Sequence, residues 1–320
     1  MKPHHIFTSL LLPLAFIAAL FFGPHIGQPL SPRLTPATSQ KAVQRGLNWL
    51  HSQQETTGPR AGAIGSATAT CDTARVVALT GENPDGPQWT QDNISLLQRC
   101  QLDLPQLLAR DDAGAIAKVL RTAVATGKNP RDFGGYDLVA MLEAHYDPAT
   151  GLYHPKNLFR NALALLALEE AQRPIPPQAI DALIDQRNPD HCWGWPVGGD
   201  RTDTDTTGLV IAALAPYQQQ AISQCVNTLK MHQLPDGGWE ARWGDEESNS
   251  DSTALVITGL LAAGIDPQSP EFTPGNINAV QALLNFQAAD GAFWWKRDTP
   301  GTLLLGTNHS LLPLAVISKQ

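Results

Sequence analysis

Two kinds of helical segment alternate along this chain, and this alternation is its most constraining feature. One kind is amphipathic and ends in glutamine or a polar turn, whereas the other is small and apolar nearly all round. The amphipathic segments are residues 40–54, 91–101, 136–146, 177–187, 218–233 and 276–287. The apolar segments are residues 71–81, 111–127, 156–171, 205–214, 251–264 and 308–317. The six pairs predict an all-α fold in which amphipathic helices cover buried apolar ones.

Six helix pairs with small inner helices can close into a ring, so we expect an α6/α6 toroid, a barrel of six helix hairpins. An open solenoid is the alternative, but it requires polar capping repeats at its ends. The last apolar segment runs almost to the C-terminus, at residue 317 of 320, which favours closure.

A polar residue stands near the start of each apolar segment, where it can accept hydrogen bonds from unpaired helix N–H groups. Asp and Asn are favoured N-caps for this reason, and the pattern predicts that all six residues cap their helices. These residues are Asp72, Asp112, Asn157, Asp205, Asp251 and Asn308.

The four cysteines lack the spacing of a zinc site, and an exported chain permits disulfides. Cys71 starts an apolar segment and Cys100 ends the next amphipathic one, so antiparallel packing brings both to one side of the ring. We therefore expect a Cys71–Cys100 disulfide. Cys192 and Cys225 form the second pair only because they remain.

The N-terminus predicts export. Residues 1–23 contain the uncharged stretch from Ile6 to Phe22 and are expected to be a signal peptide or membrane anchor. Residues 24–38 are expected to be a Pro-rich linker, and residues 39–320 the toroid domain. The domain would then be secreted, or held by its anchor, in the periplasm or cell envelope. The net charge of −8 and the absence of a basic stripe argue against a nucleic-acid partner.

Two repeats carry a shared turn motif, "QLPDGGW" (233–239) and "QAADGAF" (287–293). The Gln can bond helix-end carbonyls, the Gly supplies a positive φ, and the aromatic folds back onto the helix end. The motif therefore predicts stapling of the repeats. The tryptophan-rich loops at the same rim are also candidate ligand contacts, through Trp193, Trp195, Trp239, Trp243, Trp294 and Trp295.

These Gln-x-x-Asp-Gly-x-aromatic repeats resemble the terpenoid cyclase and protein prenyltransferase α/α-toroid superfamily. The second half of the chain, with "DTDTTGLVIAALAPY" and "SNSDSTALVITGLLAAGIDP", is similar to exported bacterial toroid proteins related to the transcobalamin and intrinsic-factor helical domain. The resemblance implies the toroid fold, which hosts several activities. Zinc ligands of the prenyltransferases have no matching residues here, and no metal or cofactor is expected.

The stretch "DTDT" (203–206) invites a catalytic interpretation. In squalene–hopene-type cyclases an Asp-x-Asp-Asp motif protonates an alkene through its middle Asp. The resemblance implies Asp205 as that acid, with Asp203 beside it, but Thr206 replaces the last Asp. Because one capping role explains the polar residue in all six repeats, we favour Asp205 as an N-cap over Asp205 as an acid.

Helix N-termini, polar groups and aromatics at one barrel end form a candidate small-molecule site. Asp251 and His309, near the starts of the last two apolar segments, join the tryptophans as candidate ligand contacts. The favoured function is a non-catalytic binder of a hydrophobic or amphipathic molecule, isoprenoid or corrinoid-like. The alternatives are a class II terpenoid cyclase-type enzyme with Asp205 as acid, and a scaffold that binds an envelope protein.

Overall fold

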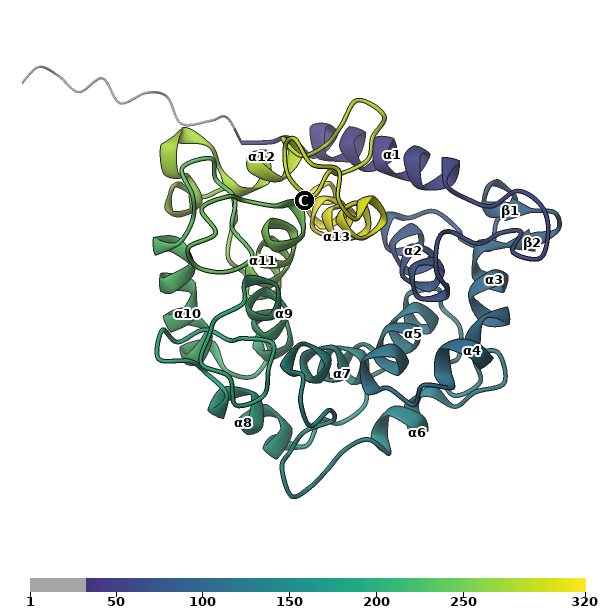
Figure 1. Ribbon diagram of the computed structural model, residues 1–320, viewed down its shortest axis with the longest axis horizontal. Coiled ribbons are helices and arrows are strands. Elements are labelled where there is room, and N and C mark those ends of the chain that lie inside the picture. The colour runs from purple at the N-terminus through teal and green to yellow at the C-terminus, as the bar shows by residue number, and fades with distance from the viewer. Residues whose placement is uncertain (1–32) are drawn as a thin grey trace, which may run out of the picture.

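The computed structural model describes residues 33–320, which close into a ring of helices (Figure 1). The expected signal peptide or anchor and most of the expected linker lie outside these residues. The inner helices are α2 (Ala67–Thr80), α5 (Ala113–Ala125), α7 (Leu158–Glu170), α9 (Thr204–Leu214), α11 (Ser250–Ala262) and α13 (Leu303–Ile317). The outer helices are α1 (Pro36–Ser52), α3 (Leu96–Leu102), α6 (Leu138–Glu143), α8 (Pro177–Asp185), α10 (Gln219–Met231) and α12 (Ala279–Leu284).

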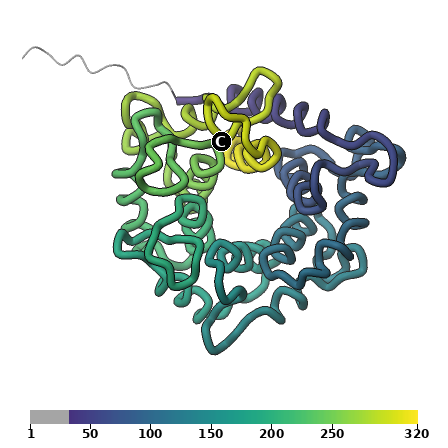
Figure 2. The backbone as a smooth tube through the Cα atoms, in the orientation of Figure 1, coloured from purple at the N-terminus to yellow at the C-terminus, as the bar shows by residue number. Residues whose placement is uncertain are grey.

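Each inner helix packs against the next one around the ring, and α13 contacts α2, so the ring is closed (Figure 2). The alternation of apolar and amphipathic segments predicted this arrangement. The open solenoid is therefore excluded for the described chain. Helices α9 and α11 are buried over almost their whole length, as expected for helices that face neighbours on every side.

The remaining elements are short connections at the outside of the ring. They are α4 (Leu104–Leu108), the hairpin β1 (Thr90–Gln91) and β2 (Ile94–Ser95), and the 3-10 turns η1 (Pro87–Trp89), η2 (Pro270–Phe272) and η3 (Pro274–Asn276). None of them was expected from the helical periodicity, because each is too short to show a period. Within residues 33–320 no helix is long and apolar enough to cross a membrane.

The N-cap prediction is confirmed at two helices and wrong at four. Asp112 caps α5 and Asn157 caps α7, each through its side-chain oxygen. The other four residues lie inside their helices, namely Asp72, Asp205, Asp251 and Asn308. These helices begin earlier, after Ser66, Asp203, Asn249 and Thr302. Each of these sites offers another Ser, Thr, Asp or Asn upstream, and burial of the helix, rather than the choice among caps, decides where it starts.

The glutamine turns join neighbouring repeats. Gln233 Nε2 donates to Gly237 O in its own turn at 2.7 Å and to Phe272 O in the next repeat at 3.1 Å. Gln287 Nε2 does the same with Gly291 O and with Ala42 O of α1, at 3.1 and 2.8 Å. The second of these bonds crosses from the last outer helix to the first, so one turn motif both builds the repeats and closes the ring.

The aromatic residue of each turn is held by a threonine of the following inner helix. The backbone N–H groups of Trp193, Trp239 and Phe293 donate to the hydroxyls of Thr207, Thr253 and Thr307. Both disulfides also join adjacent elements: Cys71 pairs with Cys100, as the helix order favoured, and Cys192 pairs with Cys225.

Candidate functional site

A cavity of about 450 Å³ runs through the centre of the ring and is lined by all six inner helices. Its middle is a belt of aliphatic side chains, which we call the leucine belt: Val76, Leu163, Leu166, Leu209, Leu255 and Leu312. A second hollow of about 500 Å³ adjoins it between α2 and α13, sharing Asp72, Lys118, Leu305 and Asn308. The volume of the central cavity lies in the range of small-molecule sites, ~300–1,000 Å³.

Polar groups stand at both ends of the leucine belt. At the end formed by the inner-helix N-termini, His309 and Asn308 of α13 line the cavity. Towards the other end, in the C-terminal halves of α2, α5 and α7, Arg75, Arg121 and Glu170 line it. The cavity therefore presents an apolar middle between two chemically different ends.

An acidic cluster lies at the N-terminal end, where α9, α11 and α13 meet. Ser252 Oγ donates to Asp205 Oδ1 at 2.6 Å, and His309 Nδ1 lies 3.0 Å from Asp251 Oδ1. Asp205 lies one turn before Leu209 on α9, and Asp251 one turn before Leu255 on α11. Residues four apart share a helix face, so each carboxylate lies one turn before a cavity-lining leucine, but neither Asp205 nor Asp251 lines the cavity itself.

Burial raises the pKa of Asp205 to about 6, and the neighbouring charge of Asp203 adds to the effect. Asp203 itself accepts the N–H of Thr206 as the N-cap of α9. The two aspartates therefore have different surroundings. Asp203 accepts a hydrogen bond from the start of α9, whereas Asp205 is a buried carboxyl that stays protonated in mildly acidic solution.

The tryptophans predicted as ligand contacts do not line either hollow. Trp193 and Trp239 are fully buried, and their indoles donate to Leu183 O at 2.7 Å and Leu229 O at 2.9 Å. Both therefore staple their loops to outer helices, which is the first of the two roles that the sequence suggested.

The other four tryptophans lie in the loops that precede α9, α11 and α13. Trp243 donates to Asp190 Oδ2 at 2.9 Å and stacks on His232, with ring centroids 4.1 Å apart. Trp195 is about half exposed, and Trp294 and Trp295 are partly buried. A ligand role for these four stays a prediction.

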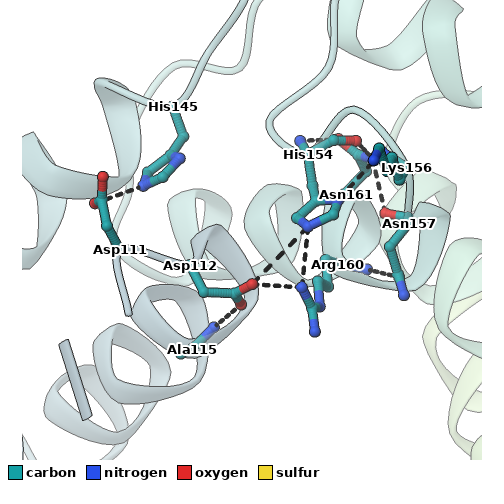
Figure 3. A network of polar contacts seen from close by, with 9 residues as sticks. All are labelled: Asp111, Asp112, Ala115, His145, His154, Lys156, Asn157, Arg160 and Asn161. Carbon is teal, nitrogen blue, oxygen red and sulfur yellow. Dashed lines mark hydrogen bonds and ion pairs between the residues drawn. The ribbon is translucent and has the colours of Figure 1, made fainter. Parts of the chain in front are cut away.

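A polar network ties α5 to α7 at the rim of the ring (Figure 3). Arg160 of α7 bonds Asp112, the N-cap of α5, and His154 lies beside both. Arg160 also packs across Gly114, where a Cβ atom would lie only 2.7 Å from its side chain. Burial and the Arg160 charge lower the pKa of His154. The network joins two neighbouring helices and is not part of the cavity lining.

Sequence reasoning missed the charged groups of the cavity wall: Arg75, Lys118, Arg121, Glu170 and Lys319. A signal was present, because the first four lie inside helices that are otherwise apolar nearly all round. A charge on such a helix must face either a partner or an internal cavity. No group of three His, Cys, Asp or Glu side chains in the described chain is arranged to hold a metal ion.

No protein-family model matches the sequence, and no curated protein matches it either. Solved structures do match. The type II terpene cyclase MstE from Scytonema superposes with a TM-score of 0.62 at 14% identity, over 87% of this chain and 98% of that one. The ent-copalyl diphosphate synthase from Streptomyces platensis gives 0.51 at 15% identity, over 88% of this chain and 67% of that one.

A glycosyl hydrolase of family 88 from Bacteroides vulgatus matches as well, with a TM-score of 0.59 at 14% identity, over 89% and 99% of the two chains. The chain thus has the α/α-toroid fold of the terpenoid cyclases. Because enzymes of unlike chemistry share this fold, the fold alone does not define an activity.

Proposed function

We propose that the protein binds a hydrophobic or amphipathic small molecule of the isoprenoid kind inside the barrel. The observation that carries the proposal is the leucine belt, an aliphatic wall around a cavity of about 450 Å³. Burying an apolar chain there gains roughly 25 cal/mol per Å² of apolar surface. Leu305 lines both hollows and is 41% exposed, so the apolar wall extends to the surface there.

The similar structures support this choice of ligand. MstE variants have been solved with geranylgeranyl dihydroxybenzoate as substrate and with merosterolic acid A as product. The wall of the belt is aliphatic, which suits the hydrocarbon chain of such a ligand better than the polar rim of a corrinoid. Two disulfides support an extracytoplasmic location, either secreted or anchored by residues 1–23.

Native mass spectrometry of the purified protein, incubated with geranylgeraniol and with a lipid extract, tests the proposal. A discrete added mass that is released on denaturation is expected. In Thr258→Phe, which fills the cavity from α11, the adduct should disappear. Met231→Phe is the matched control, because Met231 is 76% exposed on the outer helix α10. A bare protein mass in every mixture contradicts the proposal and favours a protein-binding scaffold.

A second candidate function is acid-initiated isoprenoid cyclisation by Asp205, as the resemblance to squalene–hopene-type cyclases implied. The observation that favours it is the raised pKa of this buried carboxyl, which lies one turn before the cavity-lining Leu209 on α9. The carboxylic acid would give its proton to an alkene, and the resulting cation would lose a proton elsewhere to complete an isomerisation.

The two candidates differ in what Asp205→Asn does. Catalysis predicts that conversion of a geranylgeranyl substrate stops in this variant while the adduct mass is kept. It also predicts that the wild-type rate falls above about pH 6, where Asp205 ionises. Asp181→Asn is the control, since it removes an exposed carboxylate of the outer helix α8. Unchanged turnover in Asp205→Asn would remove Asp205 from any catalytic role.

A further inference from the structure

The cavity wall is positively charged although the protein as a whole is acidic. The chain carries a net charge of −8. Two acidic and four basic side chains line the cavity: Asp72 and Glu170 against Arg75, Lys118, Arg121 and Lys319. A basic interior within an acidic protein favours an anionic ligand, because attraction by unscreened charges is strongest inside a cavity with apolar walls.

Only part of this positive charge is neutralised within the protein. Lys118 is paired with Asp72 at 2.7 Å on the wall between α2 and α5. Arg121 donates to Glu170 from Nε at 3.1 Å and from Nη2 at 2.7 Å. Arg75 Nη2 also donates to Glu170, at 3.1 Å. One carboxylate thus serves two guanidinium groups at the C-terminal end of the cavity.

Arg75 makes fewer hydrogen bonds than Arg121. Its Nε is buried and has no hydrogen-bond partner in the described chain, and its side chain is 12% exposed. A buried donor without an acceptor costs free energy, more so on a charged group. Burial first, and then the charge of Arg121, lower the pKa of Arg75 to about 10. The nearby carboxylates therefore do not fully offset the cost of burying this positive charge.

The geometry points to an anion-binding subsite at this end of the cavity. We propose that Arg75 and Arg121 hold the carboxylate or phosphate headgroup of an amphipathic ligand whose apolar body lies along the leucine belt. Guanidinium groups bind both anions well, because their planar donors match two oxygens at once. Lys319, whose Nζ donates to Leu79 O at the same end, adds a further positive charge.

This inference rests on the proposed function and adds that the ligand has an anionic headgroup and lies in one direction along the cavity. The headgroup lies at the arginine end, so the far end of the apolar chain reaches the cluster of Asp205, Asp251 and His309. An amphipathic acid or phosphate is then favoured over a neutral isoprenoid. A long enough chain would carry its terminal alkene, and not its headgroup, towards the protonated carboxyl of Asp205.

Three probes with one chain and different headgroups test the subsite on the full-length protein: geranylgeranoic acid, geranylgeranyl phosphate and geranylgeraniol. Calorimetric titration is expected to give tighter binding of both anions than of the alcohol, by about tenfold or more for a charge-assisted pair. The tighter of the two anions identifies the headgroup. Equal affinities for all three probes would overturn the subsite but leave the proposed binding function intact, whereas no binding of any probe would overturn both.

Two substitutions with opposite expected effects separate binding from a structural role. Arg75→Gln should weaken both anions about tenfold and leave the alcohol unchanged. Glu170→Gln removes the competing carboxylate and should strengthen binding of both anions. A purely structural triad predicts instead that both variants weaken all three probes together. Because the effect expected of Glu170→Gln is tighter binding of the anions, it can be measured even if Arg75→Gln fails to fold.

Discussion

Asp203 and Asp205 show how burial and neighbouring charge give two identical side chains different chemistry. Asp203 lies at the start of α9, where its oxygen accepts the N–H of Thr206 at 2.8 Å. Asp205 lies two residues further in, where burial and the charge of Asp203 raise its pKa to about 6. The side chain of Asp203 accepts a helix N–H group, whereas ionising Asp205 places a charge in a buried position near Asp203 and Asp251.

The raised pKa of Asp205 predicts a pH-dependent stability difference between the wild type and Asp205→Asn. The folded pKa of about 6 exceeds an unfolded value of ~3.9. The protonated form is therefore favoured by folding, and this contribution is present below about pH 4 and is lost as pH rises to about 6. Asn cannot ionise but still accepts from Ser252. Asp205→Asn should therefore be more stable than the wild type by about 2–3 kcal/mol above pH 7, and about equal to it near pH 4.

Urea unfolding at pH 4 and pH 8 measures this difference, with Asp181→Asn as control because its carboxylate is exposed on the outer helix α8. A gap between Asp205→Asn and the wild type that stays the same at both pH values contradicts the raised pKa.

At the scale of elements, the contact between α9 and α11 is the tightest in the ring. Gly208 of α9 faces the backbone of α11: a Cβ atom there would lie 2.5 Å from the carbonyl C and O of Leu255. Gly259 faces back, and its Cβ would lie 2.5 Å from Gly208 O. The two glycines let the helices that carry Asp205 and Ser252 approach closely enough for their side chains to bond.

Gly208→Ala should force α9 and α11 apart. The clash is with backbone atoms, which cannot move aside as a side chain does, so a loss of about 1–3 kcal/mol or more is expected despite the gain in helix propensity. Gly46→Ala is the matched control, since its Cβ would meet only the flexible end of Leu311. Thermal unfolding of the two variants compares them, and similar midpoints would contradict the packing argument.

Element by element, the helices were predictable and their ends were not. Burial imposes a local period, so residues 156–171 and 251–264 could be recognised as helices before any partner was known. The run "TDTDTT" offers several possible caps, and only packing against α11 decides that Asp203 is used. Arg75, Arg121 and Glu170 come from three consecutive inner helices and are separated by up to 95 residues, so their meeting depends on how α2, α5 and α7 pack side by side. No local pattern contains that information.

At the scale of the whole molecule, two disulfides restrain neighbouring repeats. Cys71–Cys100 and Cys192–Cys225 close loops with sequence separations of 29 and 33. In the chain-entropy model each restrains the unfolded chain by about 3–4 kcal/mol. The variant with Cys192→Ala and Cys225→Ala should therefore lose about this amount of unfolding free energy, measured by denaturant titration under oxidising conditions. An unchanged midpoint would show that the bridge does not restrain the unfolded chain.

Ring closure makes the last helix a neighbour of the first helices, and this gives the fold a stability unlike that of an open array. Helix α13 packs against α11, α1 and α2, and contains the fully buried Leu311 and Leu314. Removing the end of a solenoid costs one repeat, because each repeat contacts only the adjacent ones. Removing α13 from a ring exposes the faces of both α2 and α11 that pack against it. It also removes the helix that packs against α1, whose Ala42 O accepts the Gln287 bond.

We therefore expect deletion of residues 303–320 to abolish cooperative unfolding of the entire domain. Circular dichroism should show a loss of helix well beyond the 15 residues of α13, together with a broad thermal transition. Leu311→Ala is a less disruptive variant for comparison. It is expected to lower the free energy of unfolding by about 2–5 kcal/mol and to leave a single sharp transition. A deletion variant that keeps a sharp transition, with helix content lowered only by the share of α13, would mean that the repeats fold as an open array and that closure adds contacts without adding cooperativity.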